Sequence, residues 1–228
     1  MVILCNEPYA NTDAGESKYT DAFNKFSFEL SDFQKYSIQA IIDGHHSLVT
    51  AHTGSGKTLP AEFAINHFTG LGKKVVYTSP IKALSNQKYY EFQRKFPDIS
   101  IGLFTGDIKT NPCAQVLIMT TEILMNYLFS LDPSSDSHGD DFELNIQDEL
   151  ACVVFDEVHY INDRFRGQNW EQTILMLPPH VQMVMLSATI DNPEKFATWC
   201  ERGDEDPARK QVVLSSTCLL YTSPSPRD

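Results

Sequence analysis

The stretch AHTGSGKT, residues 51–58, joins an apolar run, residues 47–51, to a segment with helical periodicity, residues 57–69. Glycines at 54 and 56 let the backbone curl so that its amides face phosphate oxygens, and a helix N-terminus adds partial positive charge. Lys57 would place a cation beside the β and γ phosphates, and a hydroxyl at Thr58 suits Mg²⁺. The stretch therefore predicts a phosphate-binding loop formed by Thr53, Gly54, Ser55, Gly56, Lys57 and Thr58.

The same alternation of apolar run, loop and helical segment continues along most of the chain. The apolar runs are continuous rather than alternating with polar residues, which is typical of strands buried on both faces of a parallel sheet. Strands are expected at 47–51, 74–80, 100–106, 115–121, 152–158, 181–189 and 210–216, and helices at 57–69, 83–96, 121–130, 168–177 and 193–201. This order predicts an α/β fold, a doubly wound, mostly parallel sheet with helices on both faces.

The composition is that of a soluble globular protein. The chain has 228 residues, of which 42% are hydrophobic and 21% charged. No apolar run approaches the roughly 18–20 residues that span a bilayer, and the N-terminus lacks the basic region of a signal peptide. We therefore expect an intracellular protein, nuclear or cytoplasmic, with no membrane partner. The five cysteines form no Cys-x-x-Cys pair, which favours reduced thiols over a zinc site.

The net charge of −12 argues, taken alone, against nucleic acid as a partner. The charge is uneven, however, because seven acidic residues and no Lys or Arg lie between Asp132 and Glu149. The segment 131–149 is therefore interpreted as an acidic loop inserted at the surface, with an interaction surface as the alternative. The rest of the chain is only mildly acidic, so the global charge excludes little.

A pair of carboxylates, Asp156 and Glu157, follows the apolar run that begins at Cys152. A phosphate-binding loop alone would fit a nucleotide kinase, a transporter ATPase, a GTPase or a motor. Ligands bind at the carboxyl ends of strands in such sheets, where Asp156 can hold Mg²⁺ through water and Glu157 can orient the attacking water. With Lys57, these two residues are the predicted catalytic set. A buried acidic pair without a metal would be costly.

The stretch LSAT, residues 186–189, ends the next apolar run. Hydroxyls at Ser187 and Thr189 can hydrogen-bond His159 or the acidic pair, which would link the triphosphate site to a neighbouring surface. A histidine at a strand end can equally be a structural residue. The predicted coupling set is His159, Ser187, Ala188 and Thr189.

These motifs, in this order, resemble the first RecA-like domain of superfamily 2 helicases with a DExH-type acidic motif. FDEVHYINDRFRGQNWEQTILMLP (155–178) and VQMVMLSATIDNPEKFATWC (181–200) are similar to the superkiller or antiviral-type helicases that feed RNA to the exosome. The resemblance implies ATP and Mg²⁺ as cofactors, and single-stranded or partly duplex RNA, rather than DNA, as partner. It also implies exosome-type RNA decay machinery as a partner. Two features depart from that group, Gly54-Ser55 in place of Ser-Ala and the acidic insertion.

The resemblance also implies further binding residues. FSFELSDFQKYSIQAI (26–41) resembles an adenine-reading segment, in which Gln34 would contact the base and Phe28 would pack on it. Three segments, 78–92, 104–107 and 119–124, resemble nucleic-acid backbone contacts. These contacts would be made by Pro80, Lys82, Ala83, Thr105, Gly106, Asp107, Thr120, Thr121 and Glu122. Helix N-termini, amides and hydroxyls suit phosphate and ribose without a basic patch, although helix capping alone explains such residues equally well.

The expected organisation is an N-terminal extension (1–25), a first RecA-like ATP-binding domain (26–217) and a tail (218–228). The tail, CLLYTSPSPRD, resembles translated sequencing adapter, with a phosphorylated Ser-Pro tail as the alternative. A second RecA-like domain is expected to be absent from this sequence. Because that domain supplies arginine fingers, we expect the 228 residues alone to bind ATP weakly and hydrolyse little.

Three functions remain open at this point. The first is an ATP-dependent RNA helicase that translocates on and unwinds RNA in RNA processing or decay. The second is a DNA helicase or translocase of the same superfamily. The third is a non-catalytic ATP- or RNA-binding module. Intact Lys57, Thr58, Asp156 and Glu157 favour an enzyme over a degenerate module.

Overall fold

The structure is a computed structural model that describes residues 2–5, 7–9, 19–131, 144–201 and 210–216. Expectations for the tail 218–228 and for most of the acidic segment 131–149 lie outside these residues. The strands are β1 (Ile3–Cys5), β2 (His46–Thr50), β3 (Lys74–Ser79), β4 (Ile101–Phe104), β5 (Lys109–Thr110), β6 (Val116–Thr120), β7 (Leu150–Phe155), β8 (Gln182–Ser187) and β9 (Val212–Ser216). The helices are α1 (Thr20–Phe23), α2 (Asp32–Ile42), α3 (Leu59–Gly70), α4 (Lys82–Lys95), α5 (Thr121–Ser130), η1 (Val158–Asn162, 3₁₀), α6 (Gly167–Met176) and α7 (Pro193–Cys200).

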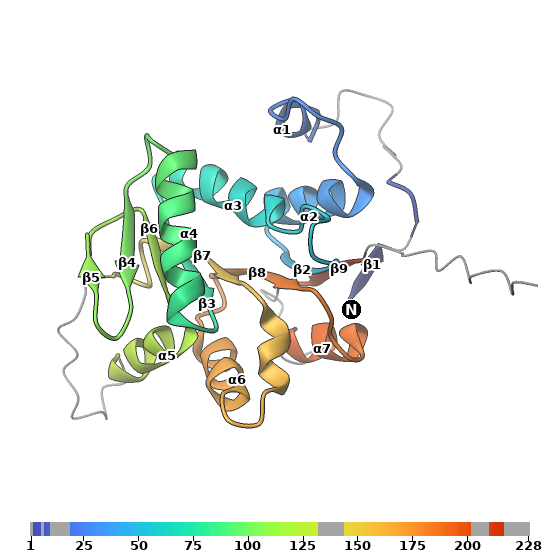
Figure 1. The fold of residues 1–228 in the computed structure, drawn as a ribbon. Helices are drawn as coiled ribbons and strands as arrows, with labels where there is room; N and C mark the ends of the chain where they lie inside the picture. Colours follow the sequence, from blue (N-terminus) through green and yellow to red (C-terminus); the bar gives the residue numbers. More distant parts are fainter. Residues whose placement is uncertain (1, 6, 10–18, 132–143, 202–209, 217–228) are drawn as a thin grey trace, which may run out of the picture.

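The strands form one sheet in the order β1-β9-β2-β8-β7-β3-β6-β4-β5 (Figure 1). Neighbouring strands are parallel except at one edge, where the short strand β5 runs antiparallel to β4. The continuous apolar runs of the sequence are these buried parallel strands, and every strand and helix expected from periodicity is present within a few residues. Among the described residues, no helix has both the length and the apolar character that crossing a membrane would require.

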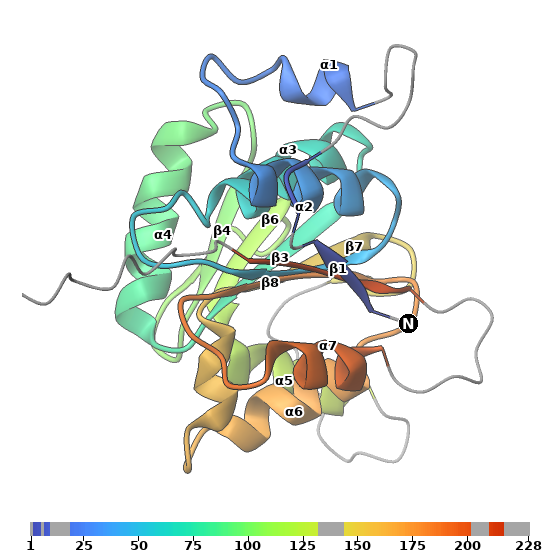
Figure 2. The ribbon, with the colours of Figure 1, turned by 90° about the vertical axis from the view of Figure 1, so that its right-hand side faces the viewer.

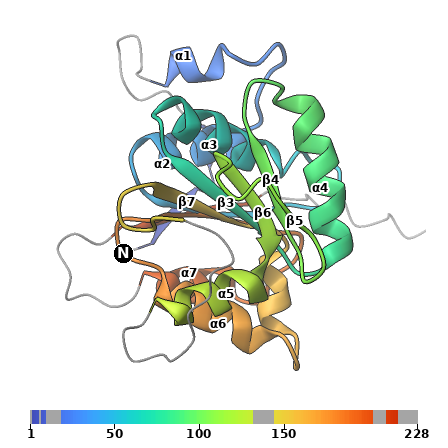
Figure 3. The ribbon, with the colours of Figure 1, turned by 90° about the vertical axis from the view of Figure 1, so that its left-hand side faces the viewer.

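Helices cover both faces of the sheet, which confirms the doubly wound class (Figure 2). On one face, α2, α3 and α4 bury a core that includes Ile38, Phe63 and Phe92. On the other face, α5, α6 and α7 bury a second core around Trp170 and Leu124. Figure 3 shows the edge formed by β4 and β5, with α4 beside it and α5 and α6 below. Successive side chains of a strand point to opposite faces, so the buried strands contribute side chains to both cores.

The strand register brings the expected motifs to one edge of the sheet. Thr50 of β2 lies opposite Ser187 of β8, and Ser79 of β3 lies opposite Thr120 of β6. The end of β7, Phe155, pairs with β3 one residue before Ser79. Because parallel strands end at the same edge, loops that are far apart in sequence gather there.

Several elements lie largely in parts of the chain where the sequence predicted no helix or strand, β5 and η1 among them. Strand β1, within the expected N-terminal extension, pairs in parallel with β9, Leu4 opposite Leu214. A three-residue strand is too short to show periodicity. Helix α1 also lies in that extension, and α2 forms within the segment 26–41. Helix α2 begins with a capping interaction in which the Ser31 amide donates to Gln34 Oε1 at 2.9 Å.

The described end of the acidic segment is partly buried rather than a solvated surface. Leu144 and Ile146 are buried in the second core. The Tyr127 hydroxyl donates to the Leu144 carbonyl at 2.6 Å, and Lys74 forms an ion pair with Glu149 at 2.8 Å. The hydrogen bond from Lys74 lowers the pKa of the Glu149 carboxyl. These contacts attach the end of the segment to β3 and α5.

Candidate functional site

The predicted phosphate-binding loop has the backbone that its glycines favour. Gly54 and Gly56 have φ values of 87° and 83°, in the left-handed region that other residues rarely adopt. A Cβ at Gly56 would lie 2.7 Å from Gln34 Nε2, so a side chain there would displace Gln34. Thr58 is the N-cap residue of α3, and the Leu59 amide donates to the Gly56 carbonyl at 3.1 Å. Thr53 is exposed and Ser55 half-buried at the mouth of this loop.

Lys57 of this loop contacts the acidic pair directly. Its Nζ lies 2.9 Å from both carboxylate oxygens of Glu157, and its side chain is only 9% exposed. The two residues follow β2 and β7, which flank β8 in the sheet. The predicted loop and the predicted acidic pair therefore form a single site.

Asp156 lies deeper than its neighbour, buried beneath the site. The Tyr77 hydroxyl of β3 donates to Asp156 Oδ2 at 2.6 Å. Burial raises the pKa of the Asp156 carboxyl, and the hydrogen bond from Tyr77 opposes part of that rise. A buried carboxylate with a raised pKa and one hydrogen-bond donor is typical of a functional site and gains further stabilisation from a cation.

Glu157 has a strained backbone. Its φ of 55° lies in the left-handed region, and the other non-glycine residues with positive φ in the described chain are both asparagines, which tolerate it better. Such outliers gather at active sites because surrounding contacts hold them there. The turn separates the directions of Asp156 and Glu157, so one stays buried while the other reaches Lys57.

The expected coupling residues meet only in part. His159 Nδ1 lies 3.4 Å from Glu157 Oε2 and 3.5 Å from Ser187 Oγ, so the histidine connects the acidic pair to β8. Ser187 also donates to the carbonyl of Thr189 at 3.1 Å. Thr189 is exposed and contributes this carbonyl rather than its hydroxyl, contrary to the expectation. Ala188 is half-buried between them.

A cavity of about 500 Å³ opens beside the phosphate loop. Its lining includes Phe28, 56% exposed, and Gln34, whose Nε2 donates to the Gly56 carbonyl at 3.2 Å. Both residues were expected at an adenine site. The sequence did not indicate two further lining residues, Glu62 and Lys95, which form an ion pair at 2.6 Å. No motif marks them, because they meet only when α3 and α4 pack together.

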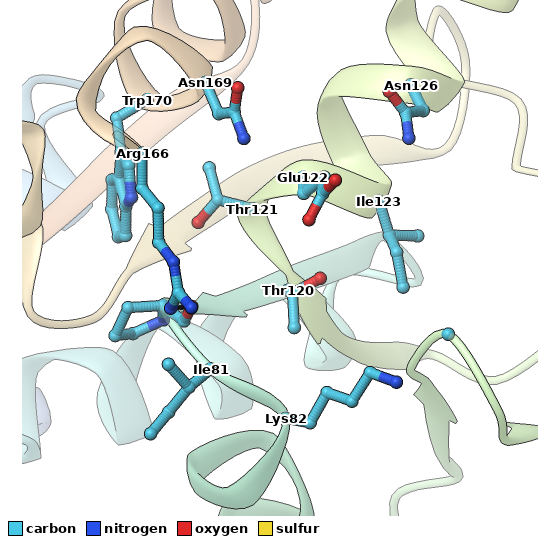
Figure 4. A pocket seen from close by; sticks show the side chains of 12 residues that line it. Ile81, Lys82, Thr120, Thr121, Glu122, Ile123, Asn126, Arg166, Asn169 and Trp170 are labelled. Carbon is cyan, nitrogen blue, oxygen red and sulfur yellow. Dashed lines mark hydrogen bonds between the residues drawn. The ribbon is translucent and has the colours of Figure 1, made fainter. Parts of the chain in front are cut away.

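A second cavity, of about 440 Å³, lies on the same edge of the sheet (Figure 4). Six residues expected to contact nucleic acid line it: Pro80, Lys82, Gly106, Thr120, Thr121 and Glu122. Six others were not expected: Ile81, Ile123, Asn126, Arg166, Asn169 and Trp170. Arg166 and Trp170 lie within the stretch 155–178, but nothing in their spacing assigned them a role.

Three expected residues do not line this cavity. Ala83 is exposed on α4, and Thr105 is buried with its backbone paired to Ile108. Asp107 is exposed and pairs with Lys82 at 2.8 Å. Asp107 therefore neutralises the lysine in this structure, and Thr105 serves to shape the turn.

Three helices begin at the second cavity. The N-cap residues of α4, α5 and α6 are Ile81, Thr120 and Arg166, and none makes a side-chain capping bond. The first turns of α4 and α5 therefore present amide hydrogens and partial positive charge, whereas the amides of Phe165, Arg166 and Gly167, at the start of α6, are hydrogen-bonded to Asp163. Thr121 lines this cavity, and its Oγ1 is buried without a hydrogen-bond partner in the described structure.

The fold places the chain in the class of RecA-like P-loop domains. The chain belongs to the DEAD/DEAH box helicase family, whose family model matches residues 31–196. It is 47% identical over 190 residues to antiviral helicase SKI2 of Saccharomyces cerevisiae, covering 83% of this chain and 14% of that protein. It is 45% identical over 178 residues to the human exosome RNA helicase MTR4, covering 78% of this chain and 16% of that protein.

A solved structure has the same fold, that of Mycobacterium smegmatis helicase Lhr bound to ssDNA and AMP-PNP. The TM-score is 0.59 at 26% identity, covering 88% of this chain and 28% of that chain. The chain thus spans about one seventh of the length of the curated relatives it matches. The similarity to the superkiller and exosome helicases agrees with the resemblance seen in residues 155–200.

Proposed function

We propose that this domain is the ATP-binding half of an ATP-dependent RNA helicase that translocates on and unwinds RNA. One observation carries the proposal: Lys57 and Glu157 meet at 2.9 Å on the same sheet edge as a cavity where three helices begin. A triphosphate site and a strand-binding site on one rim are what a nucleic-acid motor requires. The printed names of the relatives, an antiviral helicase and an exosome RNA helicase, support RNA as substrate.

The residues of the first site fit a nucleoside triphosphate. Gly56 lacks a Cβ where Gln34 approaches, and Lys57 has a carboxylate partner that phosphate oxygens can replace. Gln34 and Phe28 line the adjoining cavity, whose size suits a purine base. ATP would therefore lie with its phosphates over Thr53–Thr58 and its base against Gln34 and Phe28.

Mg²⁺ would be held by Thr58 and Asp156, whose hydroxyl and carboxylate are oxygen ligands of the kind that Mg²⁺ prefers. When bound, it would neutralise charge on the phosphate oxygens. Burial and the Tyr77 hydrogen bond keep Asp156 fixed beneath that position. Glu157, released by Lys57 when phosphate binds, would orient the attacking water.

Coupling between the two sites would pass through His159 and Ser187. His159 contacts Glu157 on one side and Ser187 on the other, so a change at Glu157 alters a hydrogen bond to β8. Ser187 in turn holds the Thr189 carbonyl, and this connects nucleotide state to the segment after β8.

The second cavity would hold the sugar–phosphate backbone. The first turns of α4 and α5 offer amides, Thr120 and Thr121 offer hydroxyls, and Lys82 offers a cation. Gly106 and Glu122, which also line the cavity, and Ala83 complete the proposed contact set. Thr105 would act by shaping the turn, and a phosphate would have to displace Asp107 from Lys82. Such contacts need no basic surface, which reconciles RNA binding with a net charge of −12.

DNA is the second candidate substrate. The solved helicase Lhr of the same fold carries ssDNA, and backbone contacts alone do not separate the two nucleic acids. We favour RNA, with exosome-type decay machinery as partner and a nuclear or cytoplasmic location, because the relatives compared above include an exosome RNA helicase at 45% identity.

The test compares ATP hydrolysis stimulated by single-stranded RNA and DNA of equal length and matching sequence. It requires a protein in which this domain is joined to a second RecA-like domain. We expect RNA to stimulate hydrolysis more, and Lys57→Ala to abolish it with either strand. Stronger stimulation by DNA would overturn the RNA assignment. Absence of stimulation by both, with ATP still bound, would favour a non-catalytic binding module.

A further inference from the structure

The turn between η1 and α6 carries an aromatic residue between two arginines, Arg164-Phe165-Arg166. Phe165 is 88% exposed, more than any other large hydrophobic residue in the described chain. An aromatic ring exposed to this extent gains free energy when a ligand covers it. Alternating cations and aromatics are typical of surfaces that bind single-stranded nucleic acid.

The turn is held in a fixed shape. Asp163 Oδ1 accepts hydrogen bonds from the amides of Phe165 and Arg166, both at 2.9 Å, and the Gly167 amide donates to the Asp163 carbonyl at 2.8 Å. These amide bonds lower the pKa of the Asp163 carboxyl, which therefore stays ionised. A Cβ at Gly167 would run into the Ile161 carbonyl, so the turn needs glycine there. Phe165 is thus presented at a set position.

Arg166 extends from this turn into the second cavity. Its Nη1 donates to the Pro80 carbonyl at 3.3 Å, which fixes the guanidinium between α6 and the start of α4. Figure 4 shows the guanidinium beside Ile81 and below Thr121. Only one of its donors is used in this contact, so the others remain available to an anion.

Thr121 gives an independent sign of a ligand in this cavity. The residue is 2% exposed, and Oγ1 has no partner within the described structure. Buried polar atoms are nearly always satisfied, so an unpaired hydroxyl on a residue that lines the cavity is consistent with a polar ligand there; Ser47 Oγ and Asn86 Oδ1, which do not line it, are also unpaired in the described structure. In Figure 4 the Thr121 hydroxyl points to the side on which Arg166 lies.

We propose that the turn Arg164-Phe165-Arg166 is a third nucleic-acid contact of this domain, in which Arg166 binds a backbone phosphate and Phe165 stacks against a base. Asp163 is a positioning residue that holds both. The proposal rests on the proposed function, because it assigns the strand-binding site a third wall beside α4 and α5. The guanidinium fork suits phosphate, and a ring face suits any base, so the contact adds affinity without sequence preference.

The experiment measures binding of the 228-residue chain to a fluorescein-labelled oligouridylate of about ten nucleotides, across a series of salt concentrations. Arg166→Gln should weaken binding about fivefold or more and reduce the slope of log affinity against log salt by about 0.7, the value for one phosphate on a single strand. Phe165→Ala should weaken binding roughly tenfold with little change in slope, and Phe165→Tyr should keep wild-type affinity.

Two matched controls remove the same groups elsewhere. Arg94→Gln takes one exposed charge from the far end of α4, and Tyr90→Ala takes one exposed ring from the same helix. Neither should change affinity beyond a small, uniform effect of net charge. Circular dichroism and thermal melting of each variant, all at exposed positions, show whether the fold is intact.

The outcomes separate this inference from the proposed function. If Arg166→Gln and Phe165→Ala both bind the oligonucleotide with wild-type affinity, the proposed third contact is wrong, while the assignment of the strand-binding cavity is unaffected. A protein partner on Phe165 would give that same result and so also overturns the inference. If Lys82→Ala and Arg166→Gln both leave binding unchanged, the cavity itself is misassigned, and the proposed function loses its strand-binding site.

Discussion

Lys57 and Glu157, one hundred residues apart in the chain, form an ion pair in which Nζ lies 2.9 Å from each carboxylate oxygen. The lysine proposed to bind phosphates is thus held by the carboxylate proposed to orient water. Under the proposed function, a triphosphate would compete with Glu157 for Lys57. The ion pair would therefore couple nucleotide binding to release of Glu157.

Glu157→Gln should raise the affinity of the chain for a slowly hydrolysed ATP analogue by about tenfold, equivalent to roughly 1.4 kcal/mol. The neutral amide holds Lys57 less strongly than a carboxylate does, and it repels phosphate less. A fluorescent ATP analogue titrated into wild-type and variant chain measures the difference. In a two-domain protein the same variant should lose hydrolysis.

Glu194→Gln is the matched control for this change. Glu194 is exposed in the first turn of α7, and its loss alters net charge equally. It should leave affinity unchanged. Weaker binding by Glu157→Gln would mean that Glu157 supports the nucleotide rather than competing with it.

Asp156→Asn should stabilise the ligand-free chain at neutral pH. Because burial raises the pKa of Asp156, the folded state binds a proton more readily than the unfolded state, and stability falls as pH rises through that pKa. Asparagine keeps an oxygen for the Tyr77 hydroxyl without the buried charge. Thermal melting from about pH 4 to pH 8 should show a gain for the variant that grows with pH and vanishes in acid.

Asp163→Asn is a control for which the expected change in stability at neutral pH has the opposite sign. Amide hydrogen bonds lower the pKa of Asp163, so its contribution to stability is present above the ordinary aspartate pKa and lost as pH falls. This variant should be less stable than wild type at neutral pH. Equal behaviour of the two variants would show that burial of Asp156 does not govern the pH dependence.

The sequence alone predicted much of this fold for a simple physical reason. Strands buried on both faces are continuous apolar runs. The polar residues and glycines at or just after their ends, Gly54, Lys57, Asp156 and Ser187, therefore stand out in the sequence. Parallel pairing then puts those loops on one edge without further information. The meeting of the predicted phosphate loop with the acidic pair at one edge of the sheet was therefore foreseeable.

What the sequence could not supply depends on packing between distant elements. Strand β1 has three residues and forms only because β9 offers it an edge. Glu62 and Lys95 meet across two helices, and Arg166 reaches the second cavity from a turn whose motif resembles a structural cap. Nothing local in these positions distinguishes a lining residue from an ordinary surface charge.

Thr121→Val should raise the stability of the ligand-free chain by about 1 kcal/mol and weaken RNA binding. The variant removes a buried hydroxyl that lacks a partner in the described structure and keeps the shape of the side chain. If Thr121 had only a structural role, the substitution would not raise the stability of the chain while lowering its affinity for RNA. Urea unfolding and oligonucleotide binding measure them on the same protein.

Thr173→Val is the control with a satisfied hydroxyl. Thr173 is fully buried on α6, and its Oγ1 donates to the Asn169 carbonyl at 2.6 Å. This variant should lose stability by about 1 kcal/mol, the usual worth of a hydrogen bond. If Thr121→Val is destabilised as much as Thr173→Val, the Thr121 hydroxyl has an unseen partner in the free protein.

Gly56→Ala should cost more stability than its backbone strain explains, and should abolish nucleotide binding. Gly44, with a φ of 79° and nothing within 4 Å of where a Cβ would lie, is the matched site, where alanine should cost about 1 kcal/mol. At Gly56, with a similar φ of 83°, the new Cβ also meets Gln34 Nε2 at 2.7 Å.

Gln34 would have to give up its hydrogen bond to the Gly56 carbonyl, which would disturb the loop and the neighbouring cavity together. Urea unfolding of the two variants isolates the Gln34 contribution, and titration with the ATP analogue reports the loop. Equal losses of stability, with nucleotide affinity kept, would show that Gln34 moves aside freely and takes no part in shaping the phosphate site.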